Sequence, residues 1–415
     1  MWTVKREMPL YEAADFGSAG LMKLIDGARP AGLQFISGCE PVIAKGNLVR
    51  MRDVACIDLF CGAGGLTHGL QREGINVVAG VDVEETCRHP FEFNNSAEFI
   101  NEDVSRVSGD RLKELFGSAE IKVLAGCAPC QPFSTYSQRY DVLSSPRWGL
   151  LYQFDRLVRE LQPEIVTMEN VPTVAKHAVF DDFSASLESQ GYVVHRGVID
   201  CTRYGLPQTR KRMVLLASRL GPIKVIEPDG SKVRTVREAI GGLTPISHGE
   251  SHPADALHTA SKLSPLNIKR IRASKPGGTW RDWPAHLVAD CHRKESGRTY
   301  PGVYGRMEWD APSPTLTTQY YGFGNGRFGH PEQERAISLR EGAILQGFPT
   351  SYSFVPEGGS IHFKTLGRMI GNAVPVTLGE VIGRSIKRHL IEMYQARPEK
   401  TEMAPRNGNR TALVA

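Results

Sequence analysis

The chain has 415 residues and 41% hydrophobic content, which predicts two or three domains, or one large domain with an insertion. Its net charge of +5 permits nucleic-acid binding but does not require it. The eight cysteines lie far apart and no signal-peptide pattern is present, so we expect a cytoplasmic protein without a disulfide framework. No apolar run approaches the ~20 residues that a membrane-spanning helix needs.

Short apolar runs separated by helical segments occupy residues 51–220 and predict a doubly wound, mostly parallel, Rossmann-like α/β sheet. An amphipathic stretch at residues 150–161, ended by Pro163, predicts a helix of this domain. Residues 1–50 do not join the alternating pattern, and we treat them as an N-terminal extension without an assigned role. The apolar runs lie at residues 54–60, 77–81, 123–125, 164–168, 192–194 and 213–217.

The composition changes after residue 220. Residues 221–334 are rich in Gly, Pro, His, Trp and Arg without a sustained helical period, which predicts a smaller domain inserted into the first. Helical patterning then returns, because Ser338 and Glu341 have the spacing of a capping box and residues 377–394 are amphipathic. We therefore expect the first domain to resume over residues 335–395, before a disordered tail at residues 396–415.

A glycine-rich turn, Phe60-x-Gly62-x-Gly64, follows the first predicted strand. Glycines at a strand end let the backbone approach a ligand at the carboxyl edge of a sheet. Asp82 and Asp103 end the next two predicted strands, where the first carboxylate can accept hydrogen bonds from a ribose diol and the second can reach a base amine. The third glycine of the dinucleotide fingerprint is missing, so the pattern favours a nucleoside cofactor without a pyrophosphate over NAD.

A Pro-Cys-Gln-Pro turn around Cys130 follows the next predicted strand, whose apolar run ends at Ala125. A cysteine in a rigid turn at a strand end is a candidate nucleophile, but Cys127 and Cys130 are also compatible with half a zinc site, a redox pair or inert packing. Glu169 ends the next strand and can face the same crevice, although a carboxylate that merely starts a helix is the simpler interpretation. Arg210 and Arg212 could lower the thiol pKa or hold a phosphate.

Taken together, these motifs resemble those of the cytosine-C5 DNA methyltransferases. Each motif is only moderately specific, but their joint order and spacing are highly specific for that family. The resemblance covers about residues 51–390. The motifs lie, in order, at residues 58–66, 82, 103, 126–134, 169–171, 208–212, 340–349 and 371–375.

The resemblance implies a role for each matching residue. Cys130 matches the nucleophile that adds to C6 of cytosine, and Glu169 matches the carboxyl group that hydrogen-bonds the base. Arg212 matches a residue that contacts the flipped base, and Arg210 matches one that supports the site. On this interpretation no metal is needed and Cys127 is a packing residue. The residues that match positions holding S-adenosylmethionine are Phe60, Gly62, Gly64, Leu66, Asp82, Asp103, Leu150 and Asn372.

The resemblance also implies that residues 221–334 form a target-recognition domain, which reads a duplex DNA sequence whose target base is flipped out. Hydroxyl groups suit phosphates and arginines suit guanine edges, so Thr315 and Arg327 are candidate DNA contacts. Arg306 and Gln319 are further candidates for reading base edges. The other residues expected to contact the substrate are Gln131, Ser134 and Gln208.

As a partner we expect double-stranded DNA, with the protein acting either alone or beside a cognate restriction endonuclease. We expect a monomer associated with the nucleoid and not with a membrane. The main alternative is an RNA enzyme that methylates cytosine C5 in transfer RNA, but such enzymes usually carry a Cys-Phe-Thr tripeptide that this sequence lacks. The intact Cys130 and Glu169 argue against a catalytically silent DNA-binding relative, and the glycine pattern and the later motifs disfavour an oxidoreductase.

Overall fold

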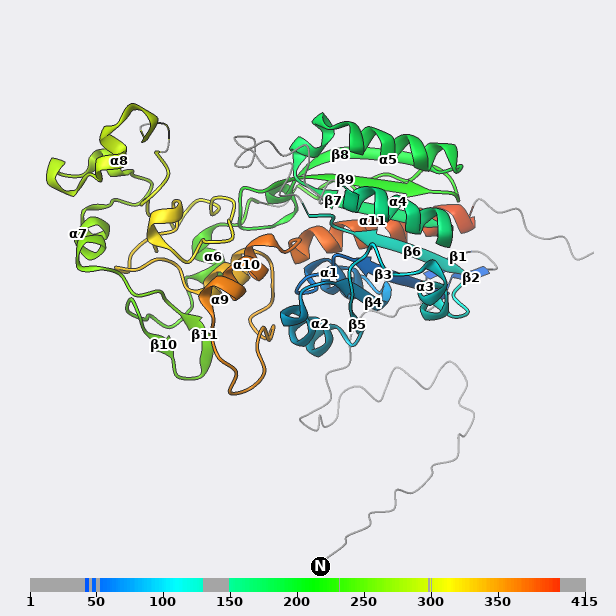
Figure 1. Cartoon of the computed structure of the whole chain (residues 1–415), viewed down its shortest axis with the longest axis horizontal. Helices are drawn as coiled ribbons and strands as arrows, with labels where there is room; N and C mark the ends of the chain where they lie inside the picture. Colours follow the sequence, from blue (N-terminus) through cyan, green and yellow to red (C-terminus); the bar gives the residue numbers. More distant parts are fainter. Residues whose placement is uncertain are drawn as a thin grey trace, which may run out of the picture. The chain divides into compact units, whose positions relative to one another are not determined.

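A seven-stranded sheet in the order β5-β4-β3-β6-β7-β9-β8 carries the elements that position the candidate site (Figure 1). The computed structural model describes residues 42–44, 47–49, 53–129, 149–230, 232–297, 299 and 301–395, which belong to one compact unit, Gly38–Ala415. Cys130, Gln131 and Ser134 lie outside the described residues. The tail at residues 396–415 and most of the predicted N-terminal extension lie outside them too.

One strand of the sheet runs against its neighbours. Strands β5, β4, β3, β6 and β7 are parallel, whereas β9 pairs antiparallel with both β7 and β8. The first residues of β9 therefore lie at the edge where the parallel strands end. This arrangement confirms the predicted mostly parallel, Rossmann-like sheet. Its strands are β3 (Val54–Leu59), β4 (Asn76–Asp82), β5 (Glu98–Asn101), β6 (Ile121–Gly126), β7 (Ile165–Asn170), β8 (Val193–Asp200) and β9 (Lys211–Ser218).

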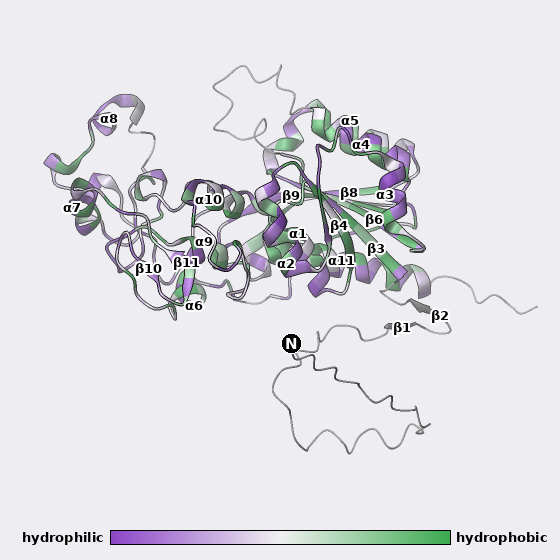
Figure 2. Ribbon diagram, turned by 60° about the horizontal axis from the view of Figure 1, so that its bottom comes forward, coloured by the Kyte–Doolittle hydropathy of each residue, from purple (hydrophilic) through white to green (hydrophobic). Residues whose placement is uncertain are grey.

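Helices cover both faces of the sheet because alternate residues of its buried strands are apolar on both sides. Val54 and Cys56 face α1 (Gly65–Arg72) and α11 (Val376–Gln395), whereas Ile57 and Leu59 of the same strand face the opposite helices. The strands are hydrophobic along most of their length (Figure 2). The helices on the second face are α3 (Gly109–Phe116), α4 (Gly149–Leu161) and α5 (Ala178–Ser189).

Helices α1 and α11 approach each other closely through two glycines. A Cβ atom at Gly69 would lie 2.3 Å from the carbonyl oxygen of Val376, and one at Gly379 would lie 2.7 Å from the carbonyl oxygen of Leu66. Any larger residue would therefore push the helices apart. This contact fixes the helix that follows the glycine-rich turn against the C-terminal helix.

The segment 221–334 adds no strand to the seven-stranded sheet among its described residues. It has a core of its own that includes Trp280, Trp283 and Phe323. A second core joins it to α9 (Leu339–Leu345), α10 (Phe363–Asn372) and α2 (Arg88–Asn95), so residues on both sides of the predicted boundary at 334 pack together. The other elements with described bounds are β1 (Val42–Ala44), β2 (Asn47–Val49), α6 (Val236–Ile240), β10 (Ser251–His252), β11 (Asp255–Thr259), α7 (Pro265–Ala273) and α8 (Asp290–Arg293).

A buried ion pair anchors the start of α9. The capping box predicted at Ser338 and Glu341 is present, and Arg335 binds both carboxylate oxygens of Glu341 at 2.7 Å. Both side chains of this pair are at most 1% exposed. Because a buried carboxylate needs a cationic or hydrogen-bonding partner, the pair holds α9 in register with the loop before it. Burial lowers the pKa of the adjacent His330 to about 4, so this histidine is neutral near pH 7.

We predict that Arg335→Met lowers the free energy of unfolding by about 3–5 kcal/mol, because it leaves the Glu341 carboxylate buried without its cation. Urea unfolding followed by circular dichroism measures the loss. Arg388→Met is the matched control, since its partner Glu392 is exposed and such a pair contributes at most about 1 kcal/mol. Equal losses in the two variants would contradict the importance given to the buried pair.

Candidate functional site

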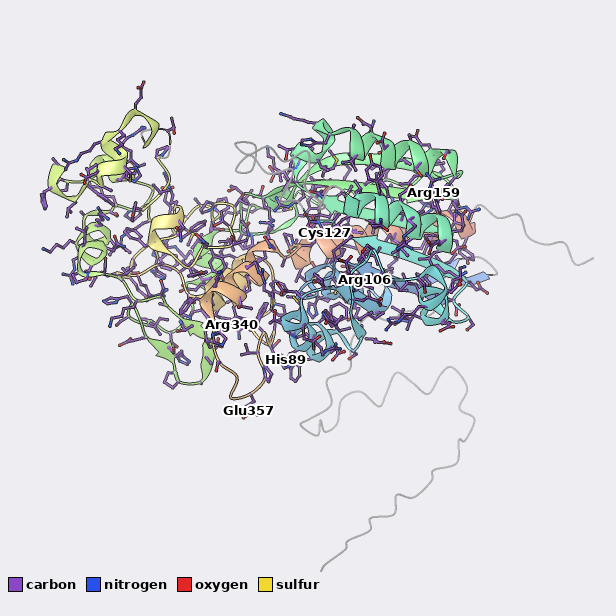
Figure 3. All side chains as sticks on the ribbon, viewed as in Figure 1. His89, Arg106, Cys127, Arg159, Arg340 and Glu357 are labelled. Atoms are coloured by element: carbon purple, nitrogen blue, oxygen red, sulfur yellow. The ribbon has the colours of Figure 1, made fainter. Side chains whose placement is uncertain are left out.

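The candidate site lies at the sheet edge where the parallel strands end, and Figure 3 labels Cys127 there. The glycine-rich turn follows β3, Asp82 ends β4, and Cys127 follows β6 directly. Glu169 lies near the end of β7, and Arg212 is the second residue of β9. The antiparallel direction of β9 is what brings Arg212 to this edge.

Glu169 carries a buried carboxylate with a neighbour on each oxygen. The thiol of Cys127 donates to Oε2 at 2.7 Å, and Arg212 Nε lies 2.8 Å from Oε1. The side chain of Glu169 is 3% exposed and that of Arg212 is 11% exposed. A carboxylate buried to this extent is stable only when it is paired, so the simpler interpretation of Glu169 as a helix-start residue does not account for its surroundings.

The backbone around Cys127 is fixed to two strands. The Cys127 amide donates to the carbonyl oxygen of Leu59 at 3.2 Å, and the buried Asn170 side chain donates to the carbonyl oxygen of Ala128 at 3.0 Å. The Asn170 oxygen in turn accepts from the Val171 amide. The sequence did not predict the hydrogen bond from Asn170 to Ala128 or the one from Cys127 to Glu169. The only sequence feature that pointed to Asn170 is its amide side chain directly after Glu169.

Arg210 and Gln208 lie just before β9 and join distant segments. Arg210 is 2% exposed and directs its guanidinium group at the carbonyl oxygens of Leu316, Gly371 and Ala373, each 3.4 Å away. These contacts agree with a supporting position for Arg210 rather than a place against the substrate.

Gln208 is fully buried and uses every hydrogen-bonding position of its amide group. Its nitrogen donates to the Leu345 carbonyl and the Gln346 side chain, and its oxygen accepts from Arg210 and the Leu316 amide. A direct contact with DNA, as the sequence predicts, would require one of these bonds to break. Gln208 therefore links the segment before β9 to the end of α9 and to Leu316.

The glycine-rich turn offers open backbone to a ligand. Gly62 has a φ of +51°, and a Cβ atom there would meet no other atom within 4 Å, whereas one at Gly64 would lie 2.5 Å from Asn95 Nδ2. Gly62 is therefore free on its outer side, and Gly64 is required by packing. Asp82 accepts hydrogen bonds at 2.9 Å from the amides of Gly62 and Glu84, which ties the turn to the end of β4. Burial raises the pKa of Asp82.

The remaining residues of the predicted cofactor site differ in exposure. Phe60 is half-buried with a φ of +59°, which is rare for a residue with a side chain. Asp103 and Asn372 are exposed, and a hydrogen bond from the Ser105 amide lowers the pKa of Asp103. Leu150 is half-buried in the first turn of α4. Leu66 packs in the core shared with α11, so a ligand could reach only its backbone.

Asp58 is a buried carboxyl group beneath the same turn. It is 1% exposed, its Oδ2 accepts from Thr67 Oγ1 at 2.7 Å, and its Oδ1 accepts no hydrogen bond from the described residues. Burial, with a smaller contribution from the charge of Asp82, raises its pKa from 3.8 to about 7. Sequence reasoning used Asp58 only to mark the start of a motif.

The residues of the segment 221–334 that are predicted to contact DNA differ in their exposure. Arg306 is buried, and its guanidinium group donates to the carbonyl oxygens of Ile271, His330 and Gln333, so its prediction as a base reader is wrong. Thr315 and Gln319 are exposed, and Thr315 donates to the Thr209 carbonyl. Arg327 is half-buried and forms no hydrogen bond or ion pair with the described residues, which leaves its donors available to a ligand.

The described residues contain no group of three or more His, Cys, Asp or Glu side chains that could hold a metal ion. Among the same residues, none of the helices has both the length and the apolar character needed to cross a membrane.

Comparisons with known proteins lead to methyltransferases. The model of the C-5 cytosine-specific DNA methylase family matches residues 54–388. Type II methylase M.HgiDII of Herpetosiphon aurantiacus is 52% identical over 82% of this chain and 97% of that protein. Type II methyltransferase M.Sau96I of Staphylococcus aureus is 28% identical over 85% of this chain and 80% of that protein. A crystal structure of a DNA modification methyltransferase from an E. coli prophage has a TM-score of 0.64 at 22% identity, covering 81% of this chain and 99% of that chain.

The buried carboxyl group of Asp58 predicts a pH dependence of stability. Its folded-state pKa is raised, so its contribution is fully present below the unfolded value of 3.8 and is lost as pH rises towards about 7. Asp58→Asn cannot titrate at this position. We therefore predict that the wild-type free energy of unfolding, relative to that of the variant, falls between pH 4 and 7. Urea unfolding of both proteins across this range measures the difference, and a constant difference would contradict the assignment.

Proposed function

The chain belongs to the C-5 cytosine-specific DNA methylase family, and we propose that it methylates cytosine C5 within a specific sequence of duplex DNA. The single observation that carries this proposal is the buried Glu169 carboxylate, held between Cys127 and Arg212 at the sheet edge that also carries the open glycine turn. At this edge the Glu169 carboxylate, which can hydrogen-bond a base, lies on the same side of the sheet as the glycine-rich turn, which can bind a nucleoside cofactor.

The proposed chemistry assigns the nucleophile to Cys130. Cytosine C5 is a poor nucleophile, and addition of the Cys130 thiolate to C6 makes the ring enamine-like, so that C5 becomes reactive. After C5 has gained the methyl group, loss of the C5 proton to a base re-forms the C5–C6 double bond, breaks the C6–S bond and releases the Cys130 thiolate. Glu169 accepts a hydrogen bond from the exocyclic amine of the base through one oxygen and shares a proton with N3 through the other, and Arg212 keeps the Glu169 side chain in place. The target base must leave the duplex, which costs a few kcal/mol of unstacking.

The cofactor proposed for this family member is S-adenosylmethionine, which supplies an electrophilic methyl group when bound. The fit rests on the open outer side of Gly62 and on the carboxylates of Asp82 and Asp103 at neighbouring strand ends. The other residues proposed to hold it are Phe60, Gly64, Leu66, Leu150 and Asn372.

The segment 221–334 is proposed as the target-recognition domain. Residues 265–295 hold seven basic and three acidic side chains, hence a net charge of +4 within a chain whose total is +5. We name this stretch the basic segment. It includes Trp280 and His292, stacked at 4.5 Å, which line a hollow of about 450 Å³ together with Arg281, Val288 and Arg293. This concentration of charge favours contacts with the DNA backbone. Thr315 stays a candidate for a phosphate contact, and Arg327, which forms no hydrogen bond or ion pair with the described residues, stays a candidate for a contact with a base edge.

The cellular setting is proposed on the same basis. A DNA substrate would place the protein in the cytoplasm at the nucleoid, as a monomer. A cognate restriction endonuclease acting on the same sequence is the proposed partner, since both bacterial relatives described above are Type II enzymes. Methylation of transfer RNA is the alternative, and its support is weaker because the family model that matches residues 54–388 is that of DNA methylases.

We predict that Cys130→Ser loses methyl transfer almost completely while it retains binding of S-adenosylmethionine, because the hydroxyl group is a far weaker nucleophile than a thiolate. Transfer of a radiolabelled methyl group to duplex DNA measures activity, and isothermal titration calorimetry measures cofactor binding. Full activity in this variant would contradict the assignment of the nucleophile, and activity on transfer RNA alone would favour the alternative substrate.

We predict that the triple variant Lys269→Gln, Lys275→Gln and Lys294→Gln weakens DNA binding uniformly across sequences. If all three lysines contact phosphates, the slope of log affinity against log salt becomes shallower by about 2–3, since each contact contributes about 0.9. Fluorescence anisotropy with labelled duplexes measures this slope. The control removes three positive charges on α3 and α11, through Arg111→Gln, Lys113→Gln and Arg388→Gln. The same change of slope in both triple variants would show a general charge effect instead of a contact surface.

A further inference from the structure

The two oxygens of the Glu169 carboxylate lie next to groups that differ greatly in strength as hydrogen-bond donors. Arg212 Nε lies 2.8 Å from Oε1, yet Oε1 accepts no hydrogen bond from the described residues, so this contact is an ion pair without hydrogen-bond geometry. Cys127 donates its thiol hydrogen to Oε2 at 2.7 Å. A thiol is a weak donor, whereas a guanidinium group is a strong one whose planar fork matches both oxygens of a carboxylate.

We propose that Cys127 is a positioning residue that holds the Glu169 carboxylate turned towards the target cytosine and away from a two-pronged pair with Arg212. The inference rests on the proposed function of this site. It departs from the sequence interpretation, in which Cys127 only packs. On this proposal Cys127 has a role beside Cys130 that requires neither a metal ion nor a redox step.

The contact is built into the fold and does not depend on a mobile side chain. The Cys127 amide donates a hydrogen bond to the carbonyl oxygen of Leu59, the last residue of β3. The carbonyl oxygen of the next residue, Ala128, accepts one from the side chain of Asn170, which follows Glu169 in β7. Cys127 is half-buried and packs against the core on the α1 and α11 face. With its backbone fixed on both sides, the short side chain keeps the sulfur atom at Oε2.

A weak hydrogen-bond donor such as the Cys127 thiol suits this position because the substrate must replace it at Oε2. In the substrate-free protein the thiol stabilises one orientation of a buried carboxylate, which would otherwise be free to rotate towards the guanidinium group. When a cytosine enters, its exocyclic amine is a stronger donor than a thiol and takes over Oε2. The carboxylate is then already in the orientation that the base requires, and no reorganisation is needed.

The test compares Cys127→Ala with Cys127→Ser in the full chain. We expect the alanine variant to lose about tenfold in kcat, the effect of one hydrogen bond, with KM for DNA changed less than twofold, because phosphate contacts dominate DNA binding. The serine variant donates to the same oxygen and should recover most of the loss. Equal activity of the two variants would overturn the proposal.

A double-mutant cycle shows whether Cys127 acts through Glu169. If it does, Cys127→Ala has no further effect in a Glu169→Gln background, and the double variant matches Glu169→Gln alone. A full tenfold further loss in that background would overturn the proposal. Infrared spectroscopy gives a readout apart from activity: the S–H stretching band that is missing in Cys127→Ala should move to higher frequency in Glu169→Gln, because an amide oxygen is a weaker acceptor than a carboxylate.

These measurements separate the inference from the proposed function. If the wild-type protein methylates DNA but Cys127→Ala is equally active, the inference fails and the function stands. If the wild-type protein transfers no methyl group, the function fails. In that case the infrared band still tests the contact, and an unchanged band in Glu169→Gln overturns the contact as well.

Discussion

The arrangement of this site depends on one buried ion pair between neighbouring strands that run in opposite directions. Glu169 approaches the edge as β7 ends, and Arg212 leaves the same edge as β9 begins. In a wholly parallel sheet the residue at the start of a strand would lie at the far edge. The single antiparallel strand is therefore what allows a carboxylate to be buried near the strand ends, where its cation is within 2.8 Å.

The same short stretch at the start of β9 joins the site to the rest of the molecule. Gln208, Arg210 and Arg212 alternate in sequence, and each meets a different set of partners. Arg212 faces Glu169, Arg210 faces carbonyl oxygens from residues 316, 371 and 373, and Gln208 reaches α9 and the residue after it. These contacts fix the segment 221–334 and helix α9 to the start of β9. Strand β9 pairs with β7, which carries Glu169.

Much of this could be predicted from sequence, and the failures have physical causes. The strands, the glycine turn and the capping box at Ser338 follow local patterns of polarity and spacing, and the structure contains them. Arg306 was wrongly expected to read bases, because its guanidinium group is used by carbonyl oxygens from residues 271, 330 and 333, and no local pattern records such distant partners. The thiol contact of Cys127 with Glu169 joins residues 42 apart and depends on strand pairing in the same way.

The central claim is that this sheet edge methylates C5 of cytosine in DNA. The most direct test is bisulfite sequencing of genomic DNA from cells that express the chain, beside cells that express Glu169→Gln. The account predicts 5-methylcytosine at one position of one short recurring sequence in the first culture and its near absence in the second. Unmodified DNA in both cultures, or the mark found only in RNA, would contradict it.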